Sequence, residues 1–158
     1  MIKNVLLFRI DERMNHGQVM ISYMKKYPAK QILCIDDATA KDAFLSSIIK
    51  MSAPAGVTID VVDTESGANL LKQGLGAPSI VLAKTPLTVK RLREAGADVG
   101  EFIIGGIADA PNRKRFYKSI FISEEEMDAV KGMLAEGVSI DVQIVASDKR
   151  VPARTLLK

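Results

Sequence analysis

The sequence predicts an α/β fold, in which a single domain is built on an open, mostly parallel twisted sheet with helices on both faces. Two observations lead to this fold class: short apolar runs alternate with stretches of helical periodicity, and tight loops join them. No internal repeat, low-complexity segment or long linker interrupts the pattern, so residues 1–158 are predicted to form one domain. The chain of 158 residues is long enough to bury a core without disulfides or metals.

The first strand-to-helix unit lies at the start of the chain. The run VLLFRI (5–10) is densely apolar, as expected of a strand that is buried on both faces. A helix is predicted over residues 17–26 because apolar residues recur there at helical spacing: Val19, Met20, Tyr23 and Met24. The loop between the two elements therefore leaves the carboxyl end of a buried strand.

The next two units follow the same plan. KQILCI (30–35) is the second predicted strand, and GVTIDVV (56–62), which alternates apolar and polar residues, is the third. Between them, four residues at i, i+1, i+5 and i+8 form the apolar face of a predicted helix: Ala43, Phe44, Ile48 and Met51. The helix after the third strand is predicted to end at Gly74 or Gly76.

A helix separates the fourth and fifth predicted strands. The fourth strand is SIVLA (79–83), and the helix begins at Thr85 and Pro86, because proline is well suited to the first helical turn. It stops near Gly96. The fifth strand, EFIIGG (101–106), ends in paired glycines.

The last predicted elements are a short strand, a helix and a final strand. KSIFI (118–122) is the short strand. Ser123 is suited to cap the following helix, Glu126 completes a capping box, and Gly137 ends the helix. SIDVQIV (139–145) is the final strand, which completes the alternation of strands and helices.

Composition excludes several classes of function. The net charge is only +3 and aromatic residues make up 5% with no Trp, so no nucleic-acid binding is expected without a concentrated basic patch. Cys34 stands alone in an apolar run, which predicts a small buried hydrophobe and no disulfide. One His and one Cys far apart predict no metal site. With no signal peptide or membrane-spanning run in the sequence, a cytoplasmic protein is expected.

The stretch FRIDERMNHGQV (8–19) contains the only histidine, His16, between a buried strand and a helix. Ligands of open parallel sheets bind at the carboxyl ends of strands, so this loop is where a site is expected. A phosphoryl group on His16 would meet the N-terminus of the helix. Arg9 and Arg13 are suited to clamp phosphoryl oxygens, and Asp11 to orient the imidazole. Two further residues complete the predicted phosphohistidine site, by close backbone approach and by amide donation: Gly17 and Gln18.

Other interpretations of this loop remain open from the residues alone. His16 next to a glycine is also typical of a solvated turn, and the neighbouring charges are typical of surface ion pairs. A Ser-His-Asp hydrolase lacks its GxSxG signature, and a histidine phosphatase or mutase lacks its second histidine. The main alternative is a non-catalytic anion-binding or nucleic-acid-binding module that uses the basic loops.

The segment RIDERMNHGQV resembles the active-site signature of the mannose/fructose/sorbose family of IIB components of the bacterial phosphoenolpyruvate-dependent sugar phosphotransferase system. That signature is commonly Arg-Ile-Asp-[Asp/Glu]-Arg-Leu-Ile-His-Gly-Gln-Val. The likeness continues in CIDDATAKDAF, LAKTP, IIGGI, SIFISEEE and GVSIDVQIV. Two departures are Met14-Asn15, where Leu-Ile is usual, and Ala146, where proline is frequent.

The resemblance implies a phosphoryl carrier. His16 would take a phosphoryl group from a IIA donor protein and pass it to a sugar on the membrane IIC and IID permease. The protein would be cytoplasmic and peripheral to that permease, with an open, mostly parallel sheet. No metal or organic cofactor is expected, and a homo-oligomer is left open.

Weaker candidates follow the other strands, where they would face the same crevice. Those candidates are Asp36, Asp37, Lys84, Thr85, Gly105 and Gly106. The two aspartates are suited to accept hydrogen bonds from Arg13 or a partner, or to cap a helix. The lysine is suited to neutralise a transferred phosphoryl group. The two glycines are suited to bring backbone close to a ligand, or to form a tight turn. A basic cluster at 113–118 is expected to be a solvated loop, with a docking surface for an acidic partner as the alternative.

Overall fold

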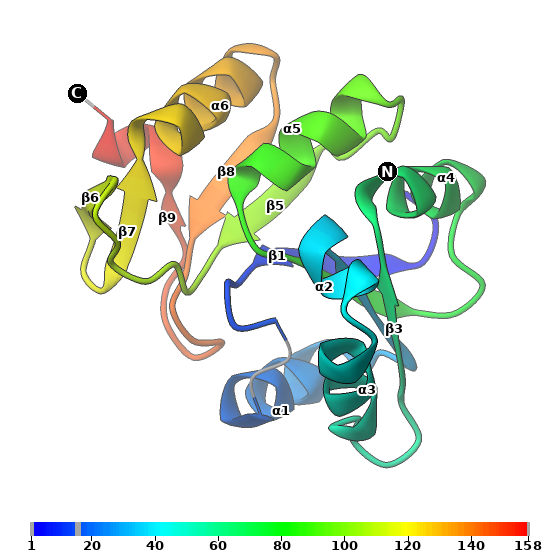
Figure 1. The fold of residues 1–158 in the computed structure, drawn as a ribbon. Helices are drawn as coiled ribbons and strands as arrows, with labels where there is room; N and C mark the ends of the chain where they lie inside the picture. The colour runs from blue at the N-terminus through cyan, green and yellow to red at the C-terminus, as the bar shows by residue number, and fades with distance from the viewer. Residues whose placement is uncertain (1, 15–16, 158) are drawn as a thin grey trace.

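The computed structural model describes residues 2–14 and 17–157, with only the backbone of Gln18. Its centre is a seven-stranded sheet (Figure 1). In spatial order the strands are β3 (Thr58–Val62), β2 (Gln31–Ile35), β4 (Ser79–Ala83), β1 (Val5–Ile10), β5 (Glu101–Ile104), β8 (Ser139–Val142) and β9 (Val151–Pro152). All neighbouring pairs are parallel up to β8, and β9 pairs antiparallel to β8 at the edge. The predicted fold class is confirmed.

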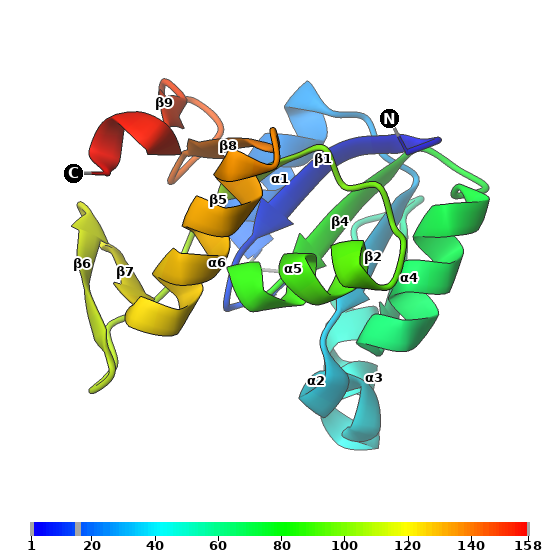
Figure 2. The same cartoon turned by 90° about the horizontal axis from the view of Figure 1, so that it is seen from above.

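Helices cover both faces of the sheet, as Figures 1 and 2 show. They are α1 (Gly17–Lys26), α2 (Asp37–Lys41), α3 (Ala43–Met51), α4 (Thr64–Gln73), α5 (Pro86–Glu94) and α6 (Glu124–Ala135), followed by a 3₁₀ turn, η1 (Ala153–Leu156). The larger core packs α4, α5 and α6 on the face that carries Phe8 and Ile10. The smaller core packs α1 on the face that carries Leu7. None of the described helices is long and apolar enough to cross a bilayer.

The strand order places a topological switch point beside the predicted site. From β1 the chain runs through α1 to β2, on one side of β1. From β5, which is the neighbour of β1 on its other side, the chain runs through α6 to β8 in the opposite direction. Because these two connections diverge on opposite faces, a crevice opens at the carboxyl ends of β1 and β5.

Most predicted elements lie where local pattern placed them. Strand β1 and helix α1 have the predicted bounds, and the capping box of Ser123 and Glu126 is present at the start of α6. The predicted final strand is shorter, because the chain leaves the sheet after Val142. Four short elements were not predicted: α2, β6, β9 and η1.

The basic cluster at 113–118 is not the expected solvated loop. Residues Arg113–Tyr117 form β6, which pairs antiparallel with β7 (Ile120–Ser123) in a separate hairpin. Arg115 stacks over the ring of Phe121, 4.9 Å from its centroid. The segment is therefore a strand, although its charged residues show no strand periodicity.

Helix α3 carries the predicted apolar face, but this face does not pack on the core. Phe44 is 75% exposed and Met51 is 85% exposed, and Ile48 is exposed as well. The inward side of the helix carries Ser46, whose hydroxyl donates to the carbonyl of Thr39 at 2.7 Å. The predicted apolar face is therefore present, and it faces solvent.

Candidate functional site

The loop after β1 is held by both neighbouring strands. The Asp11 N–H donates to the Ala83 carbonyl at the end of β4 at 2.8 Å, and the Glu12 N–H donates to the Gly106 carbonyl after β5 at 2.7 Å. The Met14 N–H then closes a turn on the Asp11 carbonyl, and the Met14 side chain is buried in the smaller core. Met14 adopts a φ of 59°, a left-handed conformation uncommon for a non-glycine residue. The loop is thus anchored up to the residue before Asn15 and His16, which lie outside the described residues.

Asp11 is a buried carboxylate that binds Arg13 at two points. Arg13 Nε lies 3.1 Å from Asp11 Oδ1, and Arg13 Nη2 lies 3.2 Å from Oδ2. The Arg13 backbone N–H and Arg9 Nη2 are the other donors, at 3.1 and 3.5 Å. A carboxylate has about four acceptor positions, so these four donors engage its acceptor capacity. Asp11 is 2% exposed and Arg13 45% exposed, so the pair presents a fixed guanidinium to solvent.

Arg9 is completely buried, in contrast to Arg13. Its Nη1 donates to the Tyr23 hydroxyl and to the Gln143 carbonyl, each at 2.7 Å, and its Nη2 donates to the Ile144 carbonyl at 2.8 Å. The guanidinium also lies over the Tyr23 ring, 4.7 Å from the centroid. Arg9 therefore joins β1, α1 and the segment after β8, and its position favours a supporting role over direct contact with phosphate.

Tyr23 and Gln143 complete this buried cluster and were not identified as site residues from the sequence. The Tyr23 hydroxyl donates to Gln143 Oε1 at 2.7 Å, and Gln143 Nε2 donates to the Asp148 carbonyl at 2.8 Å. Burial raises the pKa of Tyr23, which keeps the phenol protonated for this donation. The available signal was the polarity of these two residues within otherwise apolar periodic segments.

Gly105 and Gly106 make room for the two arginines. A Cβ at position 105 would lie 2.2 Å from Arg9 Cζ, and one at position 106 would lie 3.0 Å from Arg13 Nη2. The sequence left two interpretations open, namely close approach to a ligand or a tight turn. The structure shows a third: the missing side chains let two guanidinium groups cross the end of β5.

A second charged network joins the loop to β6 and α6. Glu12 accepts from Arg113 Nη1 at 2.9 Å and from the Ala108 N–H at 2.8 Å. Arg113 also pairs with Glu126, Nε to Oε1 at 3.1 Å, and Thr85 donates its hydroxyl to Glu126 Oε2 at 2.6 Å. Burial works to raise the pKa of Glu126, but the hydrogen bonds from Thr85, the Ser123 N–H and Arg113 outweigh it and lower the pKa. Thr85, a weaker site candidate, thus serves to cap α5 and hold Glu126.

The two aspartates after β2 do not meet Arg13. Asp36 caps α2 through the Thr39 N–H at 3.0 Å and pairs with Lys84 at 3.6 Å. Asp37 accepts from the Thr64 N–H at 2.7 Å and from Arg91 Nη1 at 3.1 Å. The Thr64 hydrogen bond lowers the pKa of Asp37 despite the opposing effect of burial. Asp36 therefore fits the capping interpretation, whereas Asp37 connects the start of α4 to Arg91 of α5.

Two open cavities flank Arg13. One, of about 360 Å³, is lined by Glu12, Arg13, Met14 and Lys84 together with residues of α3. The other, of about 250 Å³, lies toward Gly106 and Ile107. Helix α1 begins at Gly17, directly after His16 in sequence, and the first N–H groups of a helix have no partner within it. These N–H groups are donors that an anion at the start of α1 would meet.

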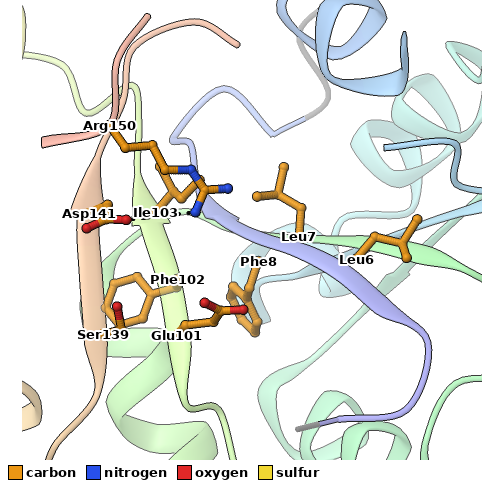
Figure 3. Close-up of a pocket in the computed structure, with 9 residues that line it drawn as sticks. All are labelled: Leu6, Leu7, Phe8, Glu101, Phe102, Ile103, Ser139, Asp141 and Arg150. Atoms are coloured by element: carbon orange, nitrogen blue, oxygen red, sulfur yellow. Dashed lines mark ion pairs between the residues drawn. The ribbon is translucent and has the colours of Figure 1, made fainter. Parts of the chain in front are cut away.

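A third cavity, shown in Figure 3, lies away from this loop. It holds only about 30 Å³ beside β1, β5 and β8, and its lining includes Glu101 and Ser139 at the amino ends of β5 and β8. Arg150 and Asp141 pair across it at 3.8 Å. Among the described residues no group of three or more His, Cys, Asp or Glu is arranged to hold a metal.

Comparison with known proteins decides the family. Residues 5–158 match the family model described as the sorbose subfamily IIB component of the phosphotransferase system. The chain belongs to this family. The IIB domain of the sorbose permease from Klebsiella pneumoniae has the same fold, with a TM-score of 0.90 and 26% identity, over 97% of this chain and 95% of that one.

Two relatives of known specificity extend the comparison. The fructose-specific EIIB component of Bacillus subtilis is 26% identical over 147 residues, covering 92% of this chain and 90% of the relative. The mannose-specific EIIAB component of Escherichia coli is 28% identical over 153 residues, covering 96% of this chain and 47% of the relative. The chain thus spans about half the length of the EIIAB components that it matches. In this IIB fold, Arg9, Asp11, Arg13, Gly105 and Gly106 gather at one point, and Lys84 borders it.

Proposed function

We propose that residues 1–158 act as one IIB domain that accepts a phosphoryl group on His16 from a phosphorylated IIA protein. The group then passes to a sugar held by the membrane IIC and IID permease, to which the protein binds peripherally. The observation that supports this most is the buried Asp11 that fixes an exposed Arg13 at the switch point of the sheet. A fixed guanidinium beside the loop is suited to bind phosphoryl oxygens.

The proposed step moves one phosphoryl group and one proton. A ring nitrogen of neutral His16 attacks the phosphorus of the donor phosphohistidine in line, so a new N–P bond forms while the donor N–P bond breaks. The proton on the other nitrogen of His16 is lost, and the donor imidazole gains one. Later His16 is the leaving group toward a sugar hydroxyl, which passes its proton to the imidazole.

Arg13, held by Asp11, which Arg9 supports, stabilises the negative charge of the transferring phosphoryl group in this step. Charge spreads over the equatorial oxygens of the transferring group, and a pre-positioned guanidinium stabilises it without reorganising. Asp11 holds Arg13 in place through the two-point contact. Arg9 in turn supports Asp11 from the buried side, where its own guanidinium is bound to two backbone carbonyls.

Intact-mass analysis at mildly alkaline pH tests the proposal. The chain is incubated with phosphoenolpyruvate, the general phosphotransferase proteins and a IIA protein, and His16→Ala is the matched control. We expect an acid-labile gain of one phosphoryl group in the wild type only. A folded wild type that stays unmodified, also with the small donor phosphoramidate, would overturn the proposal. Salt-sensitive binding to RNA or DNA by His16→Ala as well as wild type would then favour the anion-binding module.

A further inference from the structure

Helix α3 presents an apolar stripe to solvent. Phe44, Ile48 and Met51 recur at i, i+4 and i+7, so they lie on one side of the helix, and all three are exposed. Exposed apolar side chains gathered in this way are typical of a surface that another molecule covers. The helix has no need of them for its own packing, because it turns Ser46 and the half-buried Ile49 inward.

The stripe is continuous with the candidate site. The cavity of about 360 Å³ is lined by Leu45, Ile48 and Ile49 of α3, by the cations Arg13 and Lys84, and by Glu12, whose carboxylate is paired with Arg113. Apolar surface and cationic groups therefore border the same hollow. Any protein that reaches the loop after β1 from this side must also cover α3, since a stable protein contact spans about 800 Å² on each partner.

We propose that the α3 stripe, Phe44, Ile48 and Met51, is the docking surface for the soluble phosphoryl-donor protein. The proposal rests on the proposed function and adds where the donor binds. The donor brings a phosphohistidine, whose negative charge is complementary to Arg13 and Lys84. An apolar patch beside that phosphohistidine covers the stripe, which aligns the two imidazoles for transfer.

Charge argues against a second copy of this chain as the occupant. A second copy would bring no phosphoryl group to Arg13 and Lys84, whereas their positive charge suits an anionic partner. The permease presents a neutral sugar hydroxyl to the site. The donor protein, in contrast, binds with a negatively charged phosphoryl group at a time when His16 is not phosphorylated. The cations that border the stripe therefore match the donor.

Two phosphoryl donors separate docking from chemistry. Phosphoramidate is a small molecule that needs no docking surface, whereas the phosphorylated IIA protein of the same phosphotransferase system does. The variants are Phe44→Ser, Met51→Ser and their combination, and both side chains are exposed enough to be replaced without a cavity. Leu6→Ser, at an exposed apolar residue near the start of β1, is the matched control.

For the double variant we expect the rate with the IIA protein to fall about tenfold or more at low donor concentration, mainly through a higher KM. The rate with phosphoramidate should equal that of the wild type, which also shows that the variant is folded. Wild-type transfer from the IIA protein would overturn the docking site and leave the carrier function intact. A dimer that the variants abolish, with transfer unchanged, would assign the stripe to self-association instead. Failure of both donors on the wild type would overturn the proposed function, and the docking site with it.

Discussion

Arg13 binds the buried carboxylate of Asp11 at two points, Nε to Oδ1 at 3.1 Å and Nη2 to Oδ2 at 3.2 Å. The Asp11 side chain is almost inaccessible to solvent, whereas the Arg13 side chain is 45% exposed. A planar guanidinium held along one edge keeps its other edge in a fixed direction. The orientation of Arg13 is therefore set before any ligand arrives.

Arg13→Lys is expected to slow phosphorylation of the chain. An ammonium group cannot form the two-point contact with Asp11, and a lost charged hydrogen bond costs about 2 kcal/mol, or about 30-fold in rate. The measurement is the rate of phosphoryl gain with phosphoramidate. Arg91→Lys is the control, because Arg91 also pairs with an aspartate but at Asp37, away from the loop. Equal rates for both variants would contradict the clamp.

Gly105→Ala is expected to destabilise the fold. The new Cβ would lie 2.2 Å from Arg9 Cζ, and the buried guanidinium is held by four hydrogen bonds and cannot move aside cheaply. Overpacking of this kind costs about 2 to 3 kcal/mol, measured as the free energy of unfolding in urea. Gly132→Ala in α6 is the control, since nothing lies within 4 Å of its Cβ, and it should stabilise by about 1 kcal/mol. If Gly105→Ala unfolded at the same urea concentration as the wild type, the Arg9 side chain would not be fixed.

Glu126→Gln is expected to destabilise by about 3 kcal/mol at pH 7, because it removes one partner of the largely buried ion pair with Arg113. The folded state lowers the pKa of Glu126, so the carboxylate contributes fully above its ordinary pKa, about 4.3, and the contribution is lost as pH falls through the lower folded value. The difference in free energy of unfolding between variant and wild type should therefore become smaller below about pH 4.

Urea titrations from pH 7 to pH 3 measure this difference. Glu124→Gln is the control, since Glu124 lies in the same first turn of α6 but is exposed. Its effect should stay within about 0.5 kcal/mol. A difference for Glu126→Gln that does not change with pH would mean that the network with Arg113 does not favour the charged carboxyl.

Cys34 is expected to be inert in the native protein. Burial raises the pKa of its thiol to about 12, and the side chain is inaccessible in the middle of β2. A disulfide reagent at pH 8 should therefore label it only as fast as the protein unfolds. Rapid labelling in buffer, with full labelling in urea as the reference, would contradict this burial.

Several elements followed from local pattern alone. The run at 5–10 is apolar on both faces, so its bounds as a strand needed no knowledge of the partners. The start of α6 was equally local, because Ser123 and Glu126 satisfy each other's backbone N–H groups within one turn. The loop with Asp11 and Arg13 was identified from its place after the first strand.

Strand β6 was not predicted although its partner β7 follows after a short turn, because its run of Arg and Lys shows no apolar alternation. Arg113 pairs with Glu12, about a hundred positions earlier, and with Glu126 in the following helix. A segment rich in Arg and Lys is typical of a solvated loop until those partners are known. The outward stripe of α3 is a similar case, since periodicity defines an apolar face but not what covers it.

The sequence by itself determined most of the strands and helices, because these depend on neighbours within a few residues, and it singled out the loop after the first strand as the candidate site. Tertiary structure alone decided that Arg9 is buried and Arg13 is exposed, although the two arginines look equivalent in the motif. The physical reason is the packing around β1. The Arg9 side chain passes Gly105, after the end of β5, and donates hydrogen bonds to the Tyr23 hydroxyl and the Gln143 carbonyl. Arg13 lies beyond the end of the sheet and lines an open cavity.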